Sequence, residues 1–166
     1  PRPSRSGDDR RHRRDPVVSR PFAPAALDLM LVTDAAMIGD RHLEEVVLAA
    51  VAGGVTSVQL REKTLPARPF VARARRLRDL LAPHGVPLFV NDRIDVALAA
   101  GIPHVHVGQS DVAPADVRRV MGAEAVIGLS ITRPEELIAE DLAAVDYLGV
   151  GPVFATATKA DAAPAL

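Results

Sequence analysis

The sequence contains no cysteine and no tryptophan, and aromatic residues fill only 3% of its 166 positions. The absence of cysteine excludes disulfide bonds and thiolate metal sites, and it is typical of a reducing compartment, so we expect a cytoplasmic location. No run of 18 apolar residues occurs, which predicts that no segment spans a membrane. The 48% apolar content, rich in Ala, Val and Leu, instead favours helices packed on a parallel sheet within one domain.

Lysine is also scarce, because Lys63 and Lys159 are the only lysines among twenty Lys and Arg residues. An ammonium group is a compact point charge, whereas a guanidinium is a planar fork with different reach and hydration. The two lysines therefore raise the question of what these two positions bind.

Residues 1–26 carry seven arginines against three aspartates, a net charge of +4, so the remaining residues sum to −5. This segment also has five prolines and no apolar period, which predicts a disordered tail. Clustered arginines could form an arm for nucleic acid or a membrane surface, but no aromatic residues are interleaved with them, which favours a solvated leader. The segment lacks the apolar centre of a secretory signal, and its aspartates argue against a transit peptide.

From Leu27 onward, short apolar strands alternate with segments of helical period. The strands are expected at residues 29–34, 57–62, 87–92, 104–108, 125–130 and 146–154. Helices are expected at 42–54, at 66–83 with Phe70, Ala74, Leu77 and Leu81 on one face, at 94–101 and at 114–121, with a last one that opens at the capping box Thr132–Glu135.

This alternation predicts parallel βα units, which build either an open doubly wound sheet or a closed eight-stranded barrel. No strand precedes a Gly-rich dinucleotide fingerprint, and polar residues follow nearly every strand rather than gathering at one switch point. A barrel brings all these strand ends to one mouth. We therefore predict an α/β fold in which residues 27–166 supply about six units of a (β/α)8 TIM barrel.

The predicted mouth combines two carboxylates, Asp92 and Asp111, with the cations Arg61, Lys63 and Lys159. Paired carboxylates without His or Cys partners suit a hard cation such as Mg²⁺, whose shell substrate phosphates complete. The cations suit a polyphosphate. Together they indicate phosphate-ester or diphosphate chemistry without a protein nucleophile.

Several of these residues also have local interpretations, which the sequence leaves open. Asp92 and Asp111 could each cap the following helix. Arg61 and Glu62 could form a surface ion pair.

Ser130 and Thr132 could belong to a local turn or cap. His104 and His106 lie two apart on a predicted strand and could be zinc ligands, but no third His or Cys lies nearby, which favours packed or hydrogen-bonded histidines.

Five ordered motifs carry a resemblance to a known family. They read Q-L-R-E-K, V-N-D-R-x-D-x-A-L-A-x-G, V-H-x-G-Q-x-D, G-x-S and G-x-G-P-V-F-x-T-x-T-K. In this order and spacing they resemble thiamine phosphate synthase over about residues 29–166.

The resemblance implies an enzyme, a transferase that joins hydroxymethylpyrimidine diphosphate to a thiazole phosphate and releases diphosphate. It implies a dissociative mechanism in which a pyrimidine methylene cation forms before the thiazole nitrogen captures it. It also implies small-molecule substrates, no nucleic-acid or membrane partner and, by family habit, a homo-oligomer. The implied site residues are Gln59, Leu60, Arg61, Glu62, Lys63, Asn91, Ser130 and Lys159 for the pyrimidine diphosphate, with Arg61, Lys63, Ser130 and Lys159 catalytic, Asp92 and Asp111 for Mg²⁺, and Thr156, Ala157 and Thr158 for the thiazole phosphate.

Two departures from the family pattern stand out. Ala157 replaces the usual proline of the last motif, which we expect to loosen that loop. A barrel that starts near residue 28 needs two further units, about 45–50 residues beyond Leu166. The alternatives to the synthase are therefore a paralogue resembling thiazole tautomerase and an inactive fragment.

Overall fold

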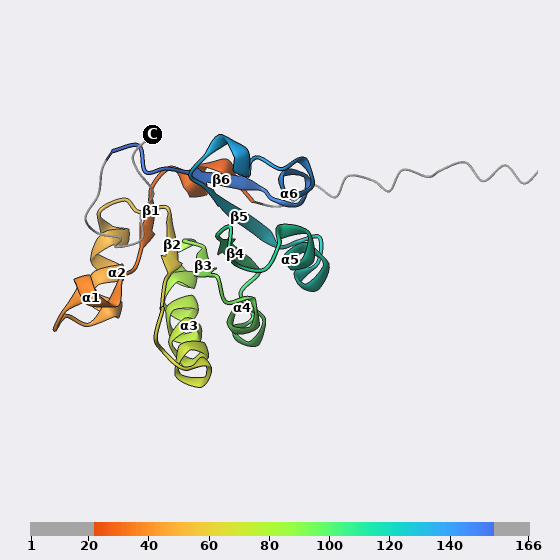
Figure 1. Ribbon diagram of the computed structural model, residues 1–166. Helices are drawn as coiled ribbons and strands as arrows, with labels where there is room; N and C mark the ends of the chain where they lie inside the picture. Colours follow the sequence, from red (N-terminus) through yellow and green to blue (C-terminus); the bar gives the residue numbers. More distant parts are fainter. Residues whose placement is uncertain (1–21, 155–166) are drawn as a thin grey trace, which may run out of the picture.

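A parallel sheet, paired in chain order from β1 to β6, organises residues 22–154, the part of the chain that the computed structural model describes (Figure 1). Each strand is short, as is common for the strands of a barrel. The strands are β1 Met30–Val32, β2 Ser57–Leu60, β3 Leu88–Asn91, β4 His104–Val107, β5 Val126–Ile131 and β6 Tyr147–Val150.

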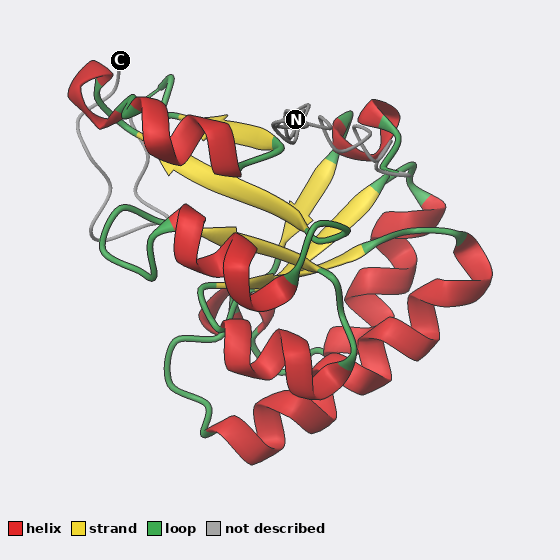
Figure 2. Ribbon diagram, turned by 90° about the vertical axis from the view of Figure 1, so that its right-hand side faces the viewer, coloured by secondary structure: helices red, strands yellow, loops and turns green. Residues whose placement is uncertain are grey.

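Helices follow the strands and gather against one face of the sheet, and the sheet curls so that its opposite face is concave (Figures 1 and 2). This curled sheet confirms the prediction of an incomplete α/β barrel. The α-helices are α1 Ala35–Ile38, α2 Leu43–Ala52, α3 Ala67–Leu81, α4 Ile94–Ala100, α5 Pro114–Met121 and α6 Ala139–Ala144, and the 3₁₀ turns are η1 Pro24–Leu27, η2 Ala82–His84 and η3 Pro134–Glu136.

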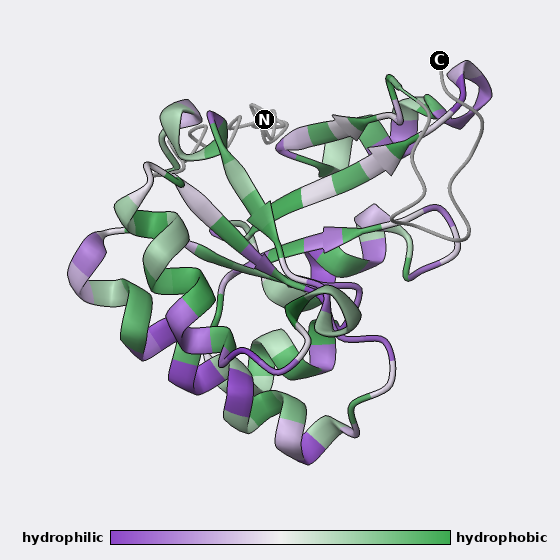
Figure 3. Cartoon of the chain, turned by 90° about the vertical axis from the view of Figure 1, so that its left-hand side faces the viewer, coloured by the Kyte–Doolittle hydropathy of each residue, from purple (hydrophilic) through white to green (hydrophobic). Residues whose placement is uncertain are grey.

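The main hydrophobic core lies between the sheet and its helices. The predicted face of α3 is buried as expected, and it packs with strand residues such as Val58, Val105 and Ile127. Figure 3 shows hydrophobic colour along most of the strands, whereas the strongest hydrophilic colour lies on the helices and loops. Successive side chains of a strand point to opposite faces of the sheet, so every second strand residue packs against the helices.

The alternate strand residues face the concave side and build a second, more polar layer. Phe89 of β3 packs edge-on against Tyr147 of β6, with ring centroids 5.7 Å apart, and lies 5.1 Å from the His104 ring. Gln59 and His106 are buried on this side as well. This layer carries the side chains that the barrel presents to its mouth.

Three local expectations differ from the structure. The strand expected at 146–154 ends at Val150. The capping glutamate is Glu136 rather than Glu135: its carboxylate accepts from Thr132 N at 2.7 Å and closes a 3₁₀ turn whose N-cap is Arg133. Glu136 takes this role because the N-cap lies one residue later than expected, which makes Glu136 the N3 residue. The helix expected to open here is instead this 3₁₀ turn, and the α-helix begins only at α6.

Part of the segment predicted to be a disordered tail is structured. Phe22 packs against Phe89, with ring centroids 5.8 Å apart, and η1 follows directly. These residues lie at the amino ends of the strands; residues 1–21 of the predicted tail lie outside the described residues. Within residues 22–154 no helix combines the length and hydrophobicity that a membrane crossing requires.

Candidate active site

The carboxyl ends of β2 to β5 bring most of the predicted polar residues to one mouth, because parallel neighbours end at the same edge of the sheet. Arg61 and Lys63 follow β2, Asn91 ends β3 and Asp111 follows β4. Ser130 lies near the end of β5. The contacts among these side chains define what the mouth can bind.

Arg61 is held by the first strand unit. Its guanidinium donates to Asp34 Oδ2 at 2.8 Å, and its backbone N–H donates to Thr33 Oγ1 at 3.0 Å. The other carboxylate oxygen of Asp34 accepts from Ala36 N and so caps α1. The alternative of a surface pair with Glu62 is wrong, since Asp34 is the partner.

Lys63 reaches across to the end of β3, where its Nζ donates to Asp92 Oδ2 at 2.6 Å. Asn91 Nδ2 donates to the other oxygen, Asp92 Oδ1, at 2.7 Å. Asp92 adopts a φ of 60°, a left-handed conformation that non-glycine residues rarely take and that clusters at functional sites. The cap alternative for Asp92 is wrong, because Arg93 is the N-cap of α4.

Asp111 forms the second carboxylate of the mouth. Its Oδ2 accepts from Gly108 N at 2.7 Å, which folds the loop after β4, and the cap alternative is wrong because Ala113 is the N-cap of α5. Burial, together with the neighbouring charge of Asp92, raises the pKa of Asp111 above its ordinary value. Burial and a neighbouring like charge both disfavour the ionised form of a carboxyl group, and a nearby cation would oppose both effects.

Ser130 connects to a buried histidine rather than to a turn, which excludes its local interpretation. Its Oγ lies 2.9 Å from His106 Nε2, and its carbonyl accepts from Gln109 Nε2 at 2.8 Å. The other ring nitrogen, His106 Nδ1, lies 2.9 Å from the Tyr147 hydroxyl. Burial lowers the pKa of His106 to about 4, although the charge of Asp92 acts in the opposite direction.

The two strand histidines do not form a metal site. His104 stacks on Phe89, and its buried Nδ1 has no hydrogen-bond partner among the described residues. Over residues 22–154 no group of three His, Cys, Asp or Glu side chains could hold a metal ion. A metal in this mouth would therefore rely on Asp92 and Asp111 together with ligands from a substrate.

Three further predicted residues differ in what they present to the mouth. The Gln59 side chain is buried on the concave face. Leu60 is fully buried in the core beside the helices, and the Glu62 carboxylate pairs with Arg73 of α3. At Leu60 and Glu62 only the main chain can face a ligand in the mouth.

The last motif lies outside the described residues, so Thr156, Ala157, Thr158 and Lys159 have no described place in the site. Sequence reasoning also missed two residues that the structure brings to the site. Asp34 follows β1 as Asp92 follows β3, a parallel that could have identified it. Tyr147 carries no motif signal, because its contact with His106 depends on the strand register.

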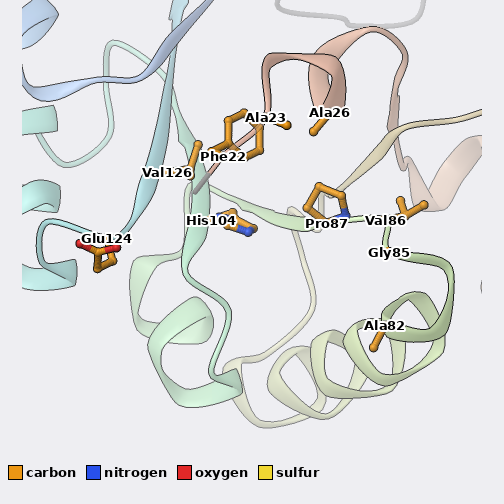
Figure 4. Close-up of a pocket in the computed structure, with 10 residues that line it drawn as sticks. All are labelled: Phe22, Ala23, Ala26, Ala82, Gly85, Val86, Pro87, His104, Glu124 and Val126. Atoms are coloured by element: carbon orange, nitrogen blue, oxygen red, sulfur yellow. The ribbon is translucent and has the colours of Figure 1, made fainter. Parts of the chain in front are cut away.

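An open cavity lies at the other end of the sheet (Figure 4). It measures about 400 Å³ and is lined mainly by apolar groups at the amino ends of β3 to β5, among them Phe22, Val86 and Val126, with His104 at its wall. Catalytic groups of barrels lie at the carboxyl ends of their strands, so this cavity is not the candidate site.

Comparison with known proteins identifies the family of the chain. Residues 29–166 match the family model described as "Thiamine monophosphate synthase". The chain belongs to this family. It is 53% identical over 143 residues to a thiamine-phosphate synthase from Xanthobacter autotrophicus, which covers 86% of this chain and 68% of the relative. It is 55% identical over 139 residues to one from Albidiferax ferrireducens, covering 84% and 64%.

A solved structure shares the fold of this thiamine phosphate synthase family member. The thiamine phosphate pyrophosphorylase from Pyrococcus furiosus superposes with a TM-score of 0.71 at 32% identity, over 78% of this chain and 62% of that one. The chain thus spans about two thirds of the length of these relatives.

Proposed function

We propose that the protein is a thiamine phosphate synthase that joins hydroxymethylpyrimidine diphosphate to a thiazole phosphate. The observation that carries this proposal is the convergence of Arg61, Lys63, the Asn91–Asp92 pair and Ser130 at one mouth of a chain from this family. A mouth with cations and carboxylates but without a protein nucleophile suits a reaction that proceeds by charge stabilisation and positioning.

The diphosphate binds between the cations of the β2 end. Arg61 and Lys63 approach it from one side, and Lys159 adds a third cation from the last motif. Gln59, Asn91 and Ser130 provide polar contacts to the same substrate, while Leu60 and Glu62 contribute main-chain groups. In the free protein both cations rest against carboxylates, Arg61 on Asp34 and Lys63 on Asp92, so their charges remain balanced until an anion enters.

The mouth suits a Mg²⁺ ion. Burial and, to a lesser extent, the charge of Asp92 raise the pKa of Asp111. The Lys63 ammonium already pairs with Asp92, at a position that would also attract a metal ion. Two carboxylates plus substrate phosphates are an ordinary Mg²⁺ environment. When bound, the ion would neutralise charge that develops on the leaving diphosphate.

The chemistry requires one bond to break before another forms. The bond between the pyrimidine methylene carbon and its diphosphate oxygen cleaves, and the electron pair leaves with the diphosphate. The aminopyrimidine stabilises the methylene cation, and the lone pair of the thiazole nitrogen then forms the new carbon–nitrogen bond. Arg61, Lys63 and Lys159 hold the leaving group, and Thr156, Ala157 and Thr158 position the thiazole phosphate.

A paralogue resembling thiazole tautomerase is the competing enzyme. It needs no pyrimidine diphosphate site, so the intact cationic end of β2 and its ties to Asp34 and Asp92 count against it. The substrates of the proposed reaction are small molecules. We propose further that the enzyme is cytoplasmic and that it forms a homo-oligomer.

The test separates binding from turnover. The purified chain is titrated with pyrimidine diphosphate and Mg²⁺ in a calorimeter, and product formation with thiazole phosphate is followed by mass spectrometry. Saturable, Mg²⁺-dependent binding with thiamine phosphate formation supports the proposal, and binding without product identifies an inactive fragment that keeps the pyrimidine half-site. If pyrimidine diphosphate does not bind at all, the synthase assignment of this mouth is wrong.

A further inference from the structure

A chain of three hydrogen-bonding side chains runs through the concave face of the sheet toward the mouth. The Tyr147 hydroxyl of β6 lies 2.9 Å from His106 Nδ1 of β4, and His106 Nε2 lies 2.9 Å from Ser130 Oγ of β5. Strand register places Tyr147 beside Gly128 and Ser130 beside Gly149, so Tyr147 lies one layer deeper than Ser130. The chain therefore links a deep phenol to a hydroxyl of the mouth.

Two glycines make room for this arrangement. A Cβ at Gly128 would lie 2.2 Å from the Tyr147 ring and 2.5 Å from His106 Nδ1, and one at Gly149 would lie 3.0 Å from His106 Cε1. Any other residue at Gly128 would displace both rings, since such contacts do not occur between real atoms. The backbone of β5 and β6 thus fits closely around the two aromatic side chains and fixes their positions.

The donors and acceptors of Tyr147, His106 and Ser130 determine which ring nitrogen of His106 carries the proton. A buried imidazole favours its neutral form, in which one nitrogen donates and the other accepts. If Nδ1 carried the proton, the Tyr147 hydroxyl would accept, and its own hydrogen would lack an acceptor, because His106 is its one partner within residues 22–154. The Tyr147 phenol is partly buried, and this desolvation raises its pKa, so a hydroxyl hydrogen without an acceptor is costly there. Tyr147 therefore donates to Nδ1, and the proton of the ring resides on Nε2.

This arrangement determines what Ser130 can do. Because Nε2–H donates to Ser130 Oγ, the serine hydroxyl keeps its own hydrogen free. Its carbonyl accepts from Gln109 Nε2, and among the described residues the Ser130 hydroxyl contacts only His106. The free hydrogen is available to an acceptor in the mouth.

We propose that Tyr147 and His106 are positioning residues that orient the Ser130 hydroxyl as a hydrogen-bond donor to an anionic oxygen of the substrate bound in the mouth. This inference rests on the proposed function in one respect, namely that Ser130 contacts the pyrimidine diphosphate. It deepens that function by assigning direction to the hydrogen bond and by extending the site to a phenol that does not contact the substrate.

The first experiment measures the proton arrangement directly and needs no substrate. In the full 166-residue chain labelled with ¹⁵N-histidine, long-range ¹H–¹⁵N correlation spectra report which ring nitrogen of His106 is protonated. We expect the Nε2–H tautomer in the wild-type chain and a changed Nδ1 resonance in Tyr147→Phe, which removes the donor. An Nδ1–H tautomer in the wild-type chain would overturn the proposal, whatever the protein catalyses.

The second experiment is a double-mutant cycle that connects the tyrosine to the serine. Tyr147→Phe is expected to weaken pyrimidine diphosphate binding, or to lower kcat where turnover is measured, by about tenfold, the size of one net hydrogen bond. In a Ser130→Ala background the same change should have almost no further effect, because the group that it positions is gone. Additive effects of the two substitutions would contradict the coupling.

Two controls separate positioning from general loss of packing. Thr56→Val removes a hydroxyl that bonds Leu29 near the amino ends of the strands, and its effect should be absent from binding and independent of Ser130→Ala. His106→Gln retains an N–H donor within reach of Ser130 and should restore part of the binding that His106→Leu loses. Equal losses in both variants would indicate a purely structural role and overturn the proposal. If the wild-type chain binds no pyrimidine diphosphate, the proposed function fails while the tautomer result still stands.

Discussion

The two ends of the sheet use charged side chains for opposite purposes. At the mouth, Lys63 pairs with Asp92, and the lysine side chain remains 52% exposed. At the amino end, Arg118 of α5 pairs with Asp146 before β6, and the exposed fractions are 17% and 12%. Both pairs are close, at 2.6 Å and 2.7 Å, so distance alone does not separate a functional pair from a structural one.

The remaining partners make the difference. Arg118 also donates to main-chain carbonyls, among them those of Ala125 at 2.6 Å and Ala144 at 3.0 Å, and Asp146 accepts from Ile127 N at 2.8 Å. The amino-end pair thus joins α5, β5 and α6. In contrast, the Lys63 ammonium has open surroundings in which an incoming anion can compete for it. An ion pair whose groups have several further hydrogen-bond partners stabilises the fold, whereas an ion pair with an exposed ammonium group remains available to ligands.

The largest expected effect is on stability, from Arg118→Met at the amino end. Removing the guanidinium leaves Asp146 and several carbonyls in a buried setting without this donor, so we expect the free energy of unfolding to fall by about 3–5 kcal/mol. Urea denaturation measures the change. Arg119→Met is the matched control on the same helix, because the Arg119–Asp116 pair is exposed. Similar losses in both variants would remove the distinction between ion pairs with several further partners and exposed ion pairs.

The second prediction concerns activity and the mouth. Lys63→Arg keeps the charge but replaces a compact ammonium by a fork, and we expect kcat to fall about 100-fold through misplacement of the diphosphate, with unfolding free energy nearly unchanged. Lys159→Arg is expected to act in the same direction. Steady-state kinetics with both substrates provide the measurement, and Arg76→Lys on the outer face of α3 serves as the control. Wild-type kinetics in both lysine variants would contradict the prediction.

The sequence predicted the repeated units well because local rules govern them. Short apolar runs between helical segments identified the strands, and the helical spacing of Phe70, Ala74 and Leu77 identified the buried face of α3. The boundaries were less certain where local rules compete, as at the turn that Glu136 rather than Glu135 closes.

The candidate site was predictable where one strand end supplies the residues, and it was not where several strands must be in register. Asp92 follows its strand directly and stands out in the sequence. The partner of Arg61 is instead Asp34, 27 positions away, and Tyr147 meets His106 across 41 positions. Such contacts follow from the order and register of the strands, which no local pattern encodes.

The third prediction tests the buried imidazoles between the two ends. Burial lowers the pKa of His104, and it lowers that of His106 to about 4, whereas unfolded histidines titrate near 6.5. Below pH 6.5 the unfolded chain binds protons that the folded chain does not, so stability falls as pH falls from 7 to 5. For His106 the slope approaches about 1.4 kcal/mol per pH unit.

Urea denaturation at several pH values checks this slope. His106→Asn should flatten it, and His104→Asn should flatten it less, because His104 is less completely buried. Thr56→Val alters a hydroxyl without a titratable group and should leave the slope unchanged. An unchanged slope in His106→Asn would show that other groups control the pH dependence in this range.

The smallest effect on stability is expected for an ion pair that lies at neither end of the sheet. Arg76 of α3 donates to Glu44 of α2 at 3.3 Å, with exposed fractions of 60% and 38%. Water screens such a pair, so Arg76→Gln should change the unfolding free energy by less than about 0.5 kcal/mol, and added salt should reduce even this change. Thermal and urea denaturation at low and high salt test it. A loss comparable to that of Arg118→Met would mean that pair geometry, rather than the number of buried partners, decides what an ion pair contributes in this fold.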